Sequence, residues 1–127
     1  MRLAVIGSKD FHDYKKLRSV LDKISGITTI VSGAADGTDS LSAKFALQHN
    51  IKLIEFPPDF VKYGEEAKHV RDRKIVENCD KLIAFWDDKC EGTKYTIDYA
   101  KKKGIPIKIF QIQNSPRSKE DADRQRG

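Results

Sequence analysis

The chain has 127 residues, of which 39% are hydrophobic and 34% are charged, and its formal net charge is +5. This length predicts a single domain, because domains commonly contain ~100–150 residues. The apolar runs are far shorter than the ~18–20 residues that a membrane-spanning helix needs, so we expect no membrane partner. The positive charge permits nucleic-acid binding without arguing for it, since the lysines alternate with acidic residues along the whole chain.

The N-terminal apolar run ends early, and the chain has only two cysteines. Residues 7–10 interrupt that run too soon for the core of a signal peptide, so we expect a cytoplasmic protein. Cys79 and Cys90 are then interpreted as reduced thiols. Because no histidine cluster accompanies them, we expect no metal site and no bound cofactor.

The first half of the chain alternates strand and helix patterns. Residues 3–6 form a short apolar strand, and residues 13–25 place hydrophobic side chains at helical spacing. Residues 27–31 are rich in β-branched residues and predict a second strand. After a glycine-containing loop at 32–39, a second helix is expected to run to about residue 49.

The same alternation continues in the second half. A third strand at 52–56 ends at two prolines, an irregular segment follows, and a helix is expected from about 65 to 79. A fourth strand at 81–86, a helix at 92–103 and a fifth strand at 105–110 complete the pattern. It predicts one Rossmann-like, doubly wound α/β domain over residues 1–112, with a five-stranded, mainly parallel sheet and helices on both faces. Residues 113–127 are polar and are interpreted as a flexible tail.

Ligands of such sheets bind beyond the carboxyl ends of the strands, where three loops carry suitable residues. The first loop offers Gly7, Ser8 and Lys9 to an anion, although a serine in this place often only caps the next helix. The second is the most informative, because two glycines four residues apart let the backbone curl toward a ligand. Its candidate residues are Ser32, Gly33, Gly37, Thr38 and Asp39.

The third loop repeats this pattern at the start of the last helix. Gly92 and Thr93 are suited to an anion at a helix N-terminus, and Trp86 offers a ring on which a base can stack. Arg71, on the preceding helix, can hold a phosphate through two hydrogen bonds. An aromatic residue at a strand end is nevertheless more often part of the core or its rim.

These motifs together resemble the SLOG superfamily, in its YspA/YpsA-related branch, over roughly residues 2–110. They comprise a Gly-Ser pair after the first strand, VSGAADGTD after the second, an arginine on the helix before AFWD, and a Gly-Thr helix start. The resemblance implies a Rossmann-like domain that binds nucleotides or their derivatives. The pocket residues it implies are Gly7, Ser8, Ser32, Gly33, Gly37, Asp39, Arg71, Gly92 and Thr93.

Members of this superfamily include phosphoribohydrolases, sensors of NAD-derived signals in prokaryotic and phage conflict, and proteins that bind single-stranded DNA. The hydrolases resemble the pattern PGGxGTxxE, but here Gly92-Thr93 is followed by Lys-Tyr-Thr-Ile without that glutamate. The related pattern also usually has Asn after the arginine, where this chain has Asp72.

These departures favour the binding or sequestration of a nucleotide-derived ligand. A nucleotide N-glycosidase is the alternative, with Asp98, Glu91 or Asp39 as its carboxylate. Binding of single-stranded DNA ranks lowest, because no stripe of aromatic and basic residues is visible. The sequence leaves a homo-oligomer open.

Overall fold

The computed structural model describes residues 1–112, so the predicted tail at 113–127 lies outside the described residues. Its centre is a five-stranded sheet in the order β3-β2-β1-β4-β5, and every neighbouring pair is parallel. The prediction of a Rossmann-like α/β domain is confirmed. The strands are β1 (Arg2–Gly7), β2 (Thr29–Ser32), β3 (Lys52–Glu55), β4 (Lys81–Trp86) and β5 (Ile107–Gln111).

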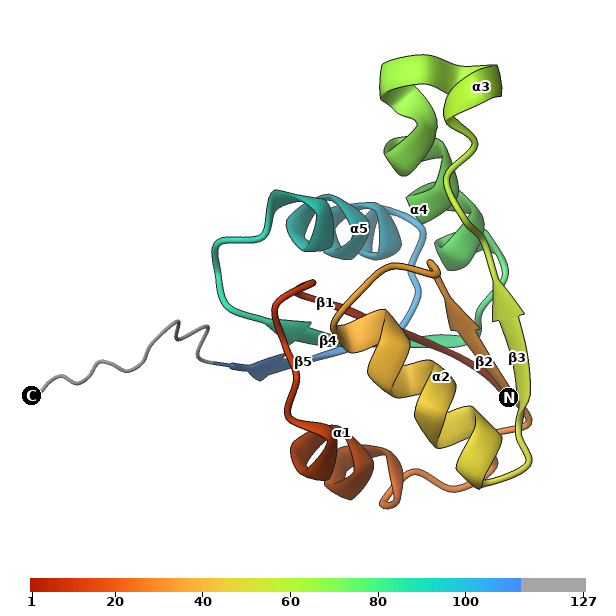
Figure 1. The fold of residues 1–127 in the computed structure, drawn as a ribbon, viewed down its shortest axis with the longest axis vertical. Helices are drawn as coiled ribbons and strands as arrows, with labels where there is room; N and C mark the ends of the chain where they lie inside the picture. Colours follow the sequence, from red (N-terminus) through yellow and green to blue (C-terminus); the bar gives the residue numbers. More distant parts are fainter. Residues whose placement is uncertain (113–127) are drawn as a thin grey trace, which may run out of the picture.

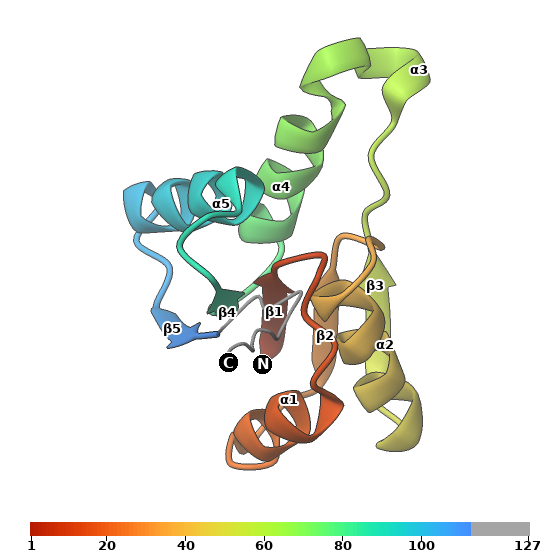
Figure 2. The same ribbon diagram turned by 60° about the vertical axis from the view of Figure 1, so that its left-hand side comes forward.

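Helices cover both faces of this sheet, as Figures 1 and 2 show. One face packs against α1 (Tyr14–Leu21) and α2 (Thr38–Gln48), and the other packs against α4 (Ala67–Glu77) and α5 (Glu91–Lys102). The short helix α3 (Phe60–Tyr63) and the 3-10 turn η1 (Gly64–Glu66) connect β3 to α4. In the described part of the chain, every helix is too short or too polar to cross a bilayer.

The strand sequences explain why the sheet is covered twice. Successive side chains of a strand point to opposite faces. Leu3 and Val5 therefore join the core under α1 and α2, whereas Ala4 and Ile6 join the core under α4 and α5. The central strands must be apolar on both faces, and β1 and β4 are apolar along their buried lengths.

Several predicted boundaries were wrong by a few residues. The first helix ends at Leu21, and the chain then tightens into a turn in which Lys23 and Ile24 bond the carbonyls three residues before them. Ile24 still packs against the core, which explains its helical spacing in the sequence. The fifth strand begins only at Ile107, since Pro106 has no N–H to donate.

The segment after Pro57-Pro58 was predicted to be irregular, but it contains α3. Asp59 caps the N-terminus of this helix, since its carboxylate accepts a hydrogen bond from the Lys62 N–H at 3.0 Å. Figure 1 shows α3 standing apart from the sheet, at the opposite end of the molecule from α1. The side chain of Val61 is fully exposed and Phe60 is 55% exposed, so this end of the molecule presents apolar surface.

Candidate functional site

The order of the strands places the candidate site at one edge of the sheet. From β1 the chain moves outward to β2 and β3, and then crosses to β4 on the other side of β1. The direction of winding therefore reverses between β1 and β4, and ligands of doubly wound sheets bind beyond the carboxyl ends of the strands near this point. All three predicted loops begin at this edge.

The loops after β1 and β2 are locked together. The Ser8 carbonyl accepts hydrogen bonds from both the N–H and the hydroxyl of Thr38, at 3.2 and 2.9 Å. Gly37 has a φ of 70°, and a Cβ at this position would collide with the Lys9 backbone. A Cβ at Gly7 would collide with the Phe85 carbonyl and the Thr38 hydroxyl. These glycines are required because two backbones approach each other here.

Arg71 reaches from α4 to the loop after β2. Its Nη1 donates to the Gly33 carbonyl, and its Nε donates to Asp72 Oδ1 at 2.7 Å. The side chains of Arg71 and Asp72 are 11% and 10% exposed, so this is a largely buried ion pair. The Thr96 hydroxyl, from α5, also lies near Asp72 and favours its ionised form. The unexpected aspartate after the arginine is therefore turned toward the arginine, whose charge it balances.

Asp39 is a second buried carboxylate beside this pair. It is 9% exposed and accepts a hydrogen bond from the Ala35 N–H at 3.1 Å. Burial raises the pKa of Asp39 to about 6, although the hydrogen bond from Ala35 and the charge of Arg71 favour the ionised form. Burial likewise raises the pKa of Asp72, against the opposing effect of Arg71.

Gly33 marks where these groups converge. A Cβ built on Gly33 would lie 2.5 Å from Arg71 Nη1 and 3.0 Å from Asp39 Oδ2. The guanidinium and the carboxylate thus border the same point of the loop, and a larger residue at position 33 would displace them. Ser32, by contrast, is the last residue of β2, and it is fully buried.

The loop after β4 is built differently. Trp86 donates its indole N–H to the Cys90 carbonyl at 3.1 Å and packs against the core under α4 and α5. The buried Thr93 donates its hydroxyl to Cys90 Sγ at 3.2 Å. Trp86 therefore helps to close its own loop and forms part of the rim of the core.

The other two carboxylates that the sequence offered for catalysis lie on the surface of α5. Glu91 is exposed, and Asp98 forms an ion pair of 2.7 Å with Lys94, one turn earlier on the same helix. Of the three candidates, Asp39 is the buried one. The structure thus separates candidates that the sequence considered together.

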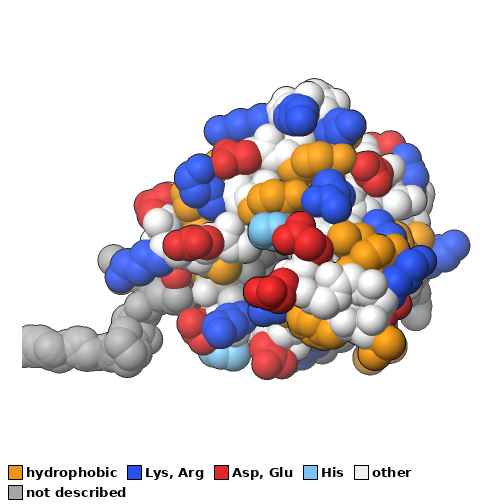
Figure 3. All heavy atoms as spheres, turned by 90° about the horizontal axis from the view of Figure 1, so that it is seen from above, with side chains coloured by type: hydrophobic (Ala, Val, Ile, Leu, Met, Phe, Trp, Pro, Cys, Tyr) orange, Lys and Arg blue, Asp and Glu red, His pale blue; other side chains and the backbone are white. Residues whose placement is uncertain are grey.

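A groove of about 530 Å³ opens beyond the carboxyl end of β3, between the chain leading to α3 and the helix α4. We call it the α4 groove. It is lined by Phe56, Pro57, Pro58, Asp59, Phe60, Val61, Tyr63, Ala67, Val70, Arg71 and Lys74. Figure 3 shows this end of the molecule, where hydrophobic side chains lie between lysine and arginine side chains.

Arg71 is the predicted site residue that lines the α4 groove, and the aromatic residues and Lys74 were missed. A signal for them was present, since Phe56, Phe60 and Tyr63 surround the two prolines in a segment too apolar for an ordinary loop. A second hollow of about 490 Å³ lies over the start of α2 and includes the predicted residues Lys9 and Gly37. Its other lining residues are Asp10, His12, Asp36, Ser40 and Leu41.

Residues 1–63 match the model of the YspA, cpYpsA-related SLOG family. The match covers the interlocked loops after β1 and β2, in the order that the sequence motifs predicted. The chain belongs to this SLOG family. No curated protein matches the chain. The matched segment ends before Arg71, so the family model covers the loop that Arg71 contacts but not Arg71 itself.

Membership of the SLOG family agrees with nucleotide-related binding or a glycosidase-like activity as the general class of function. Among residues 1–112, no group of three or more His, Cys, Asp or Glu side chains could hold a metal ion.

Proposed function

We propose that this SLOG protein binds a nucleotide or nucleotide-derived ligand in the α4 groove, with the ligand phosphate on Arg71 and Lys74. The supporting observation is the groove itself, in which two cationic side chains adjoin an apolar and aromatic wall beyond the end of β3. Small-molecule sites usually combine such a wall with a few polar groups that fix the orientation of the ligand.

The cationic side of the groove is suited to phosphate. Arg71 and Lys74 lie three residues apart on α4, so they are neighbours on one face of the helix, with Cβ atoms about 5–6 Å apart. Arg71 is held in place by Gly33 and Asp72 before any ligand arrives. A guanidinium that is already oriented loses less entropy when it binds an oxyanion.

The apolar side of the groove is suited to a base or a ribose. Phe56 and Tyr63 are half-buried, whereas Phe60 is 55% exposed. Contiguous exposed apolar patches with a polar rim mark ligand-binding grooves or partner sites, whereas singly exposed apolar side chains are ordinary. Covering these rings with a planar base would remove apolar surface from water, at about 25 cal/mol per Å².

A nucleotide N-glycosidase is the second candidate, and Asp39 favours it. A carboxyl group with a pKa of about 6 can both donate and accept a proton near neutral pH. Asp39, however, accepts a hydrogen bond from its own loop and is not among the residues that line the α4 groove. Binding without turnover therefore remains our first proposal.

The binding proposal is tested by calorimetric titration of the protein with nucleoside phosphates, NAD, ADP-ribose and cyclic nucleotides. Lys74→Gln should weaken binding of the best ligand about tenfold, because it removes an exposed charge from the groove without disturbing the core. Lys68→Gln is the matched control, since Lys68 is exposed on the same helix and does not line the groove. Equal losses for the two variants, or no binding across the whole panel, would refute the proposal.

Arg71→Ala is a less useful test of binding than Lys74→Gln. It would leave Asp72 and Asp39 buried without their cation, so a loss of affinity would be mixed with a loss of stability. The enzymatic alternative is tested separately, by chromatography of nucleoside phosphates after incubation with the protein. Release of free base that is lost in Asp39→Asn would support the glycosidase, and intact nucleotides throughout would exclude it for those substrates.

A further inference from the structure

We propose that Asp39 couples ligand binding to proton uptake: an anion bound at Arg71 drives the neighbouring Asp39 carboxylate to take up a proton. This inference rests on the proposed function, because it assigns a charge-sensing role to a residue next to the α4 groove. It makes Asp39 a determinant of the ligand charge that the site accepts, acting through Arg71.

The cluster around Arg71 contains more negative than positive groups. Asp39 and Asp72 both border Arg71, so two carboxylates share one buried guanidinium. With both carboxylates ionised, the cluster has a net charge of −1 before a ligand arrives. A phosphate would add further negative charge at the same guanidinium. The cluster can relieve this repulsion by accepting one proton.

The contacts indicate which carboxylate accepts that proton. Asp72 receives a direct ion-pair hydrogen bond from Arg71 Nε at 2.7 Å, and the nearby Thr96 hydroxyl also favours its ionised form. Asp39 is bonded instead by the backbone N–H groups of Ala35 and Gly33. Because Asp72 has the stronger charged partner, Asp39 is the site where a proton is added at the lower cost in free energy.

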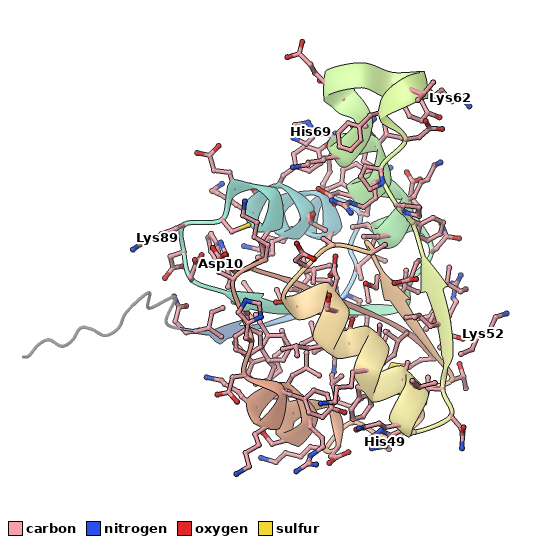
Figure 4. The ribbon with its side chains drawn as sticks, viewed as in Figure 1. Asp10, His49, Lys52, Lys62, His69 and Lys89 are labelled. Atoms are coloured by element: carbon pink, nitrogen blue, oxygen red, sulfur yellow. The ribbon has the colours of Figure 1, made fainter. Side chains whose placement is uncertain are left out.

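Charged groups approach Asp39 from α4, whereas its own loop supplies backbone dipoles. From α4 come Arg71, which favours the ionised form, and Asp72, which opposes it. Another titratable group on α4 is His69, which acts on Asp72. Its ring stacks on that of Tyr95, with 4.0 Å between the ring centroids. Figure 4 labels His69 on the part of α4 near α3, with Lys62 on the opposite side of this end of the molecule.

The consequence is a defined pH dependence of affinity. In the free protein the pKa of Asp39 is already raised to about 6, and the bound anion raises it further. Affinity should then increase as pH falls from about 8 toward 6, and should level off below that point, where Asp39 is protonated before binding. An affinity that is tenfold higher for each pH unit is the limit for uptake of one proton.

ADP-ribose is the probe for this test, since its diphosphate does not titrate near neutral pH. Affinity is measured by calorimetry between about pH 5.5 and 8, in pairs of buffers with different ionisation enthalpies, so that the number of protons taken up is obtained directly. We expect uptake of a substantial fraction of one proton at pH 7. Asp39→Asn should bind with an affinity that is nearly independent of pH, and at pH 8 more tightly than the wild type.

Asp36→Asn is the matched control, because it removes an exposed carboxylate from the same loop, outside the cluster. It should keep the wild-type pH profile. If Asp39→Asn does not fold, the proton uptake measured with the wild-type protein still tests the coupling. Binding of ADP-ribose without proton uptake would overturn the coupling and leave the proposed function standing. Failure of ADP-ribose, other nucleotides and inorganic sulfate to bind would overturn both.

Discussion

The loop after β2 and the loop after β4 have the same sequence pattern, but the fold uses them in different ways. Each places a glycine directly before a threonine at the start of a helix, Gly37-Thr38 in one and Gly92-Thr93 in the other. Gly37 is buried against the Lys9 backbone, with a φ of 70°. A Cβ built on Gly92, by contrast, would meet no described atom within 4 Å beyond its chain neighbours and the backbone of its own helix.

This difference shows that a glycine-threonine helix start has no single meaning. In the loop after β2 it lets this loop pack directly against the backbone of the loop after β1. In the loop after β4 it leaves the first turn of α5 open, between the exposed Glu91 and the buried Thr93. Substitutions that probe each glycine should therefore separate a residue required by packing from one that is not.

Gly37→Ala should give the largest effect. The new Cβ would collide with backbone atoms of Lys9 and Ser8, and an alanine with a φ of 70° and a ψ of −121° is strained as well. We expect the free energy of unfolding to fall by roughly 3 kcal/mol, measured by urea denaturation.

Gly26→Ala is the control for this measurement. Gly26 has a similar φ of 80°, but in the described part of the chain a Cβ there would meet nothing within 4 Å apart from its two chain neighbours. It should lose only about 1 kcal/mol, which is the cost of the backbone conformation alone. Equal losses for the two variants would show that the interlocking of the loops contributes no stability.

The sequence alone predicted the sheet, its helices and the loops that carry Gly7, Gly33 and Gly37. Periodicity reveals these features because burial imposes it directly on the strands and helices. It did not predict the α4 groove, because α3 is only four residues long and contains no buried residue, so its side chains follow no buried pattern.

The pairing of charges was also beyond the sequence. Arg71 and Asp39 are far apart along the chain and meet only because α4 packs beside the loop after β2. From the sequence, Asp98 and Glu91 were as good candidates as Asp39 for a catalytic carboxylate. The structure distinguishes them because both are exposed on α5. That the other predicted loop residues, such as Ser8 and Thr93, contact a ligand stays a prediction.

Asp39→Asn should give the next largest effect, and this effect depends on pH. The pKa of Asp39 in the folded protein, about 6, lies above its ordinary value of 3.8, so folding favours the protonated form. The corresponding stabilisation is complete below about pH 4 and is lost as pH rises through 6. Asparagine cannot lose a proton. Between pH 4 and pH 8 the free energy of unfolding of the variant should therefore increase by about 2 kcal/mol relative to that of the wild type.

Chemical denaturation of both proteins at several pH values measures this difference. Contributions that both proteins share cancel, including that of Asp80, whose pKa is lowered by its hydrogen bonds with Arg2. A constant gap between the two stability curves would mean that the folded protein does not perturb the pKa of Asp39.

Gly92→Ala should give the smallest effect, and it sharpens the comparison between the two loops. Gly92 lies in the first turn of α5, where alanine has the higher helix propensity and the new Cβ has room. We expect a gain of about 0.5 kcal/mol in the free energy of unfolding.

The same variant distinguishes two positions for the ligand. A phosphate seated on the N-terminus of α5 would contact Gly92, and a methyl group there would weaken binding about tenfold or more. A ligand in the α4 groove lies on the side of α4 opposite His69 and Arg73, the residues that contact Tyr95 of α5. We therefore expect nucleotide affinity, measured by calorimetry, to be unchanged. A marked loss of affinity would show that the ligand phosphate binds at the start of α5 and not at Arg71.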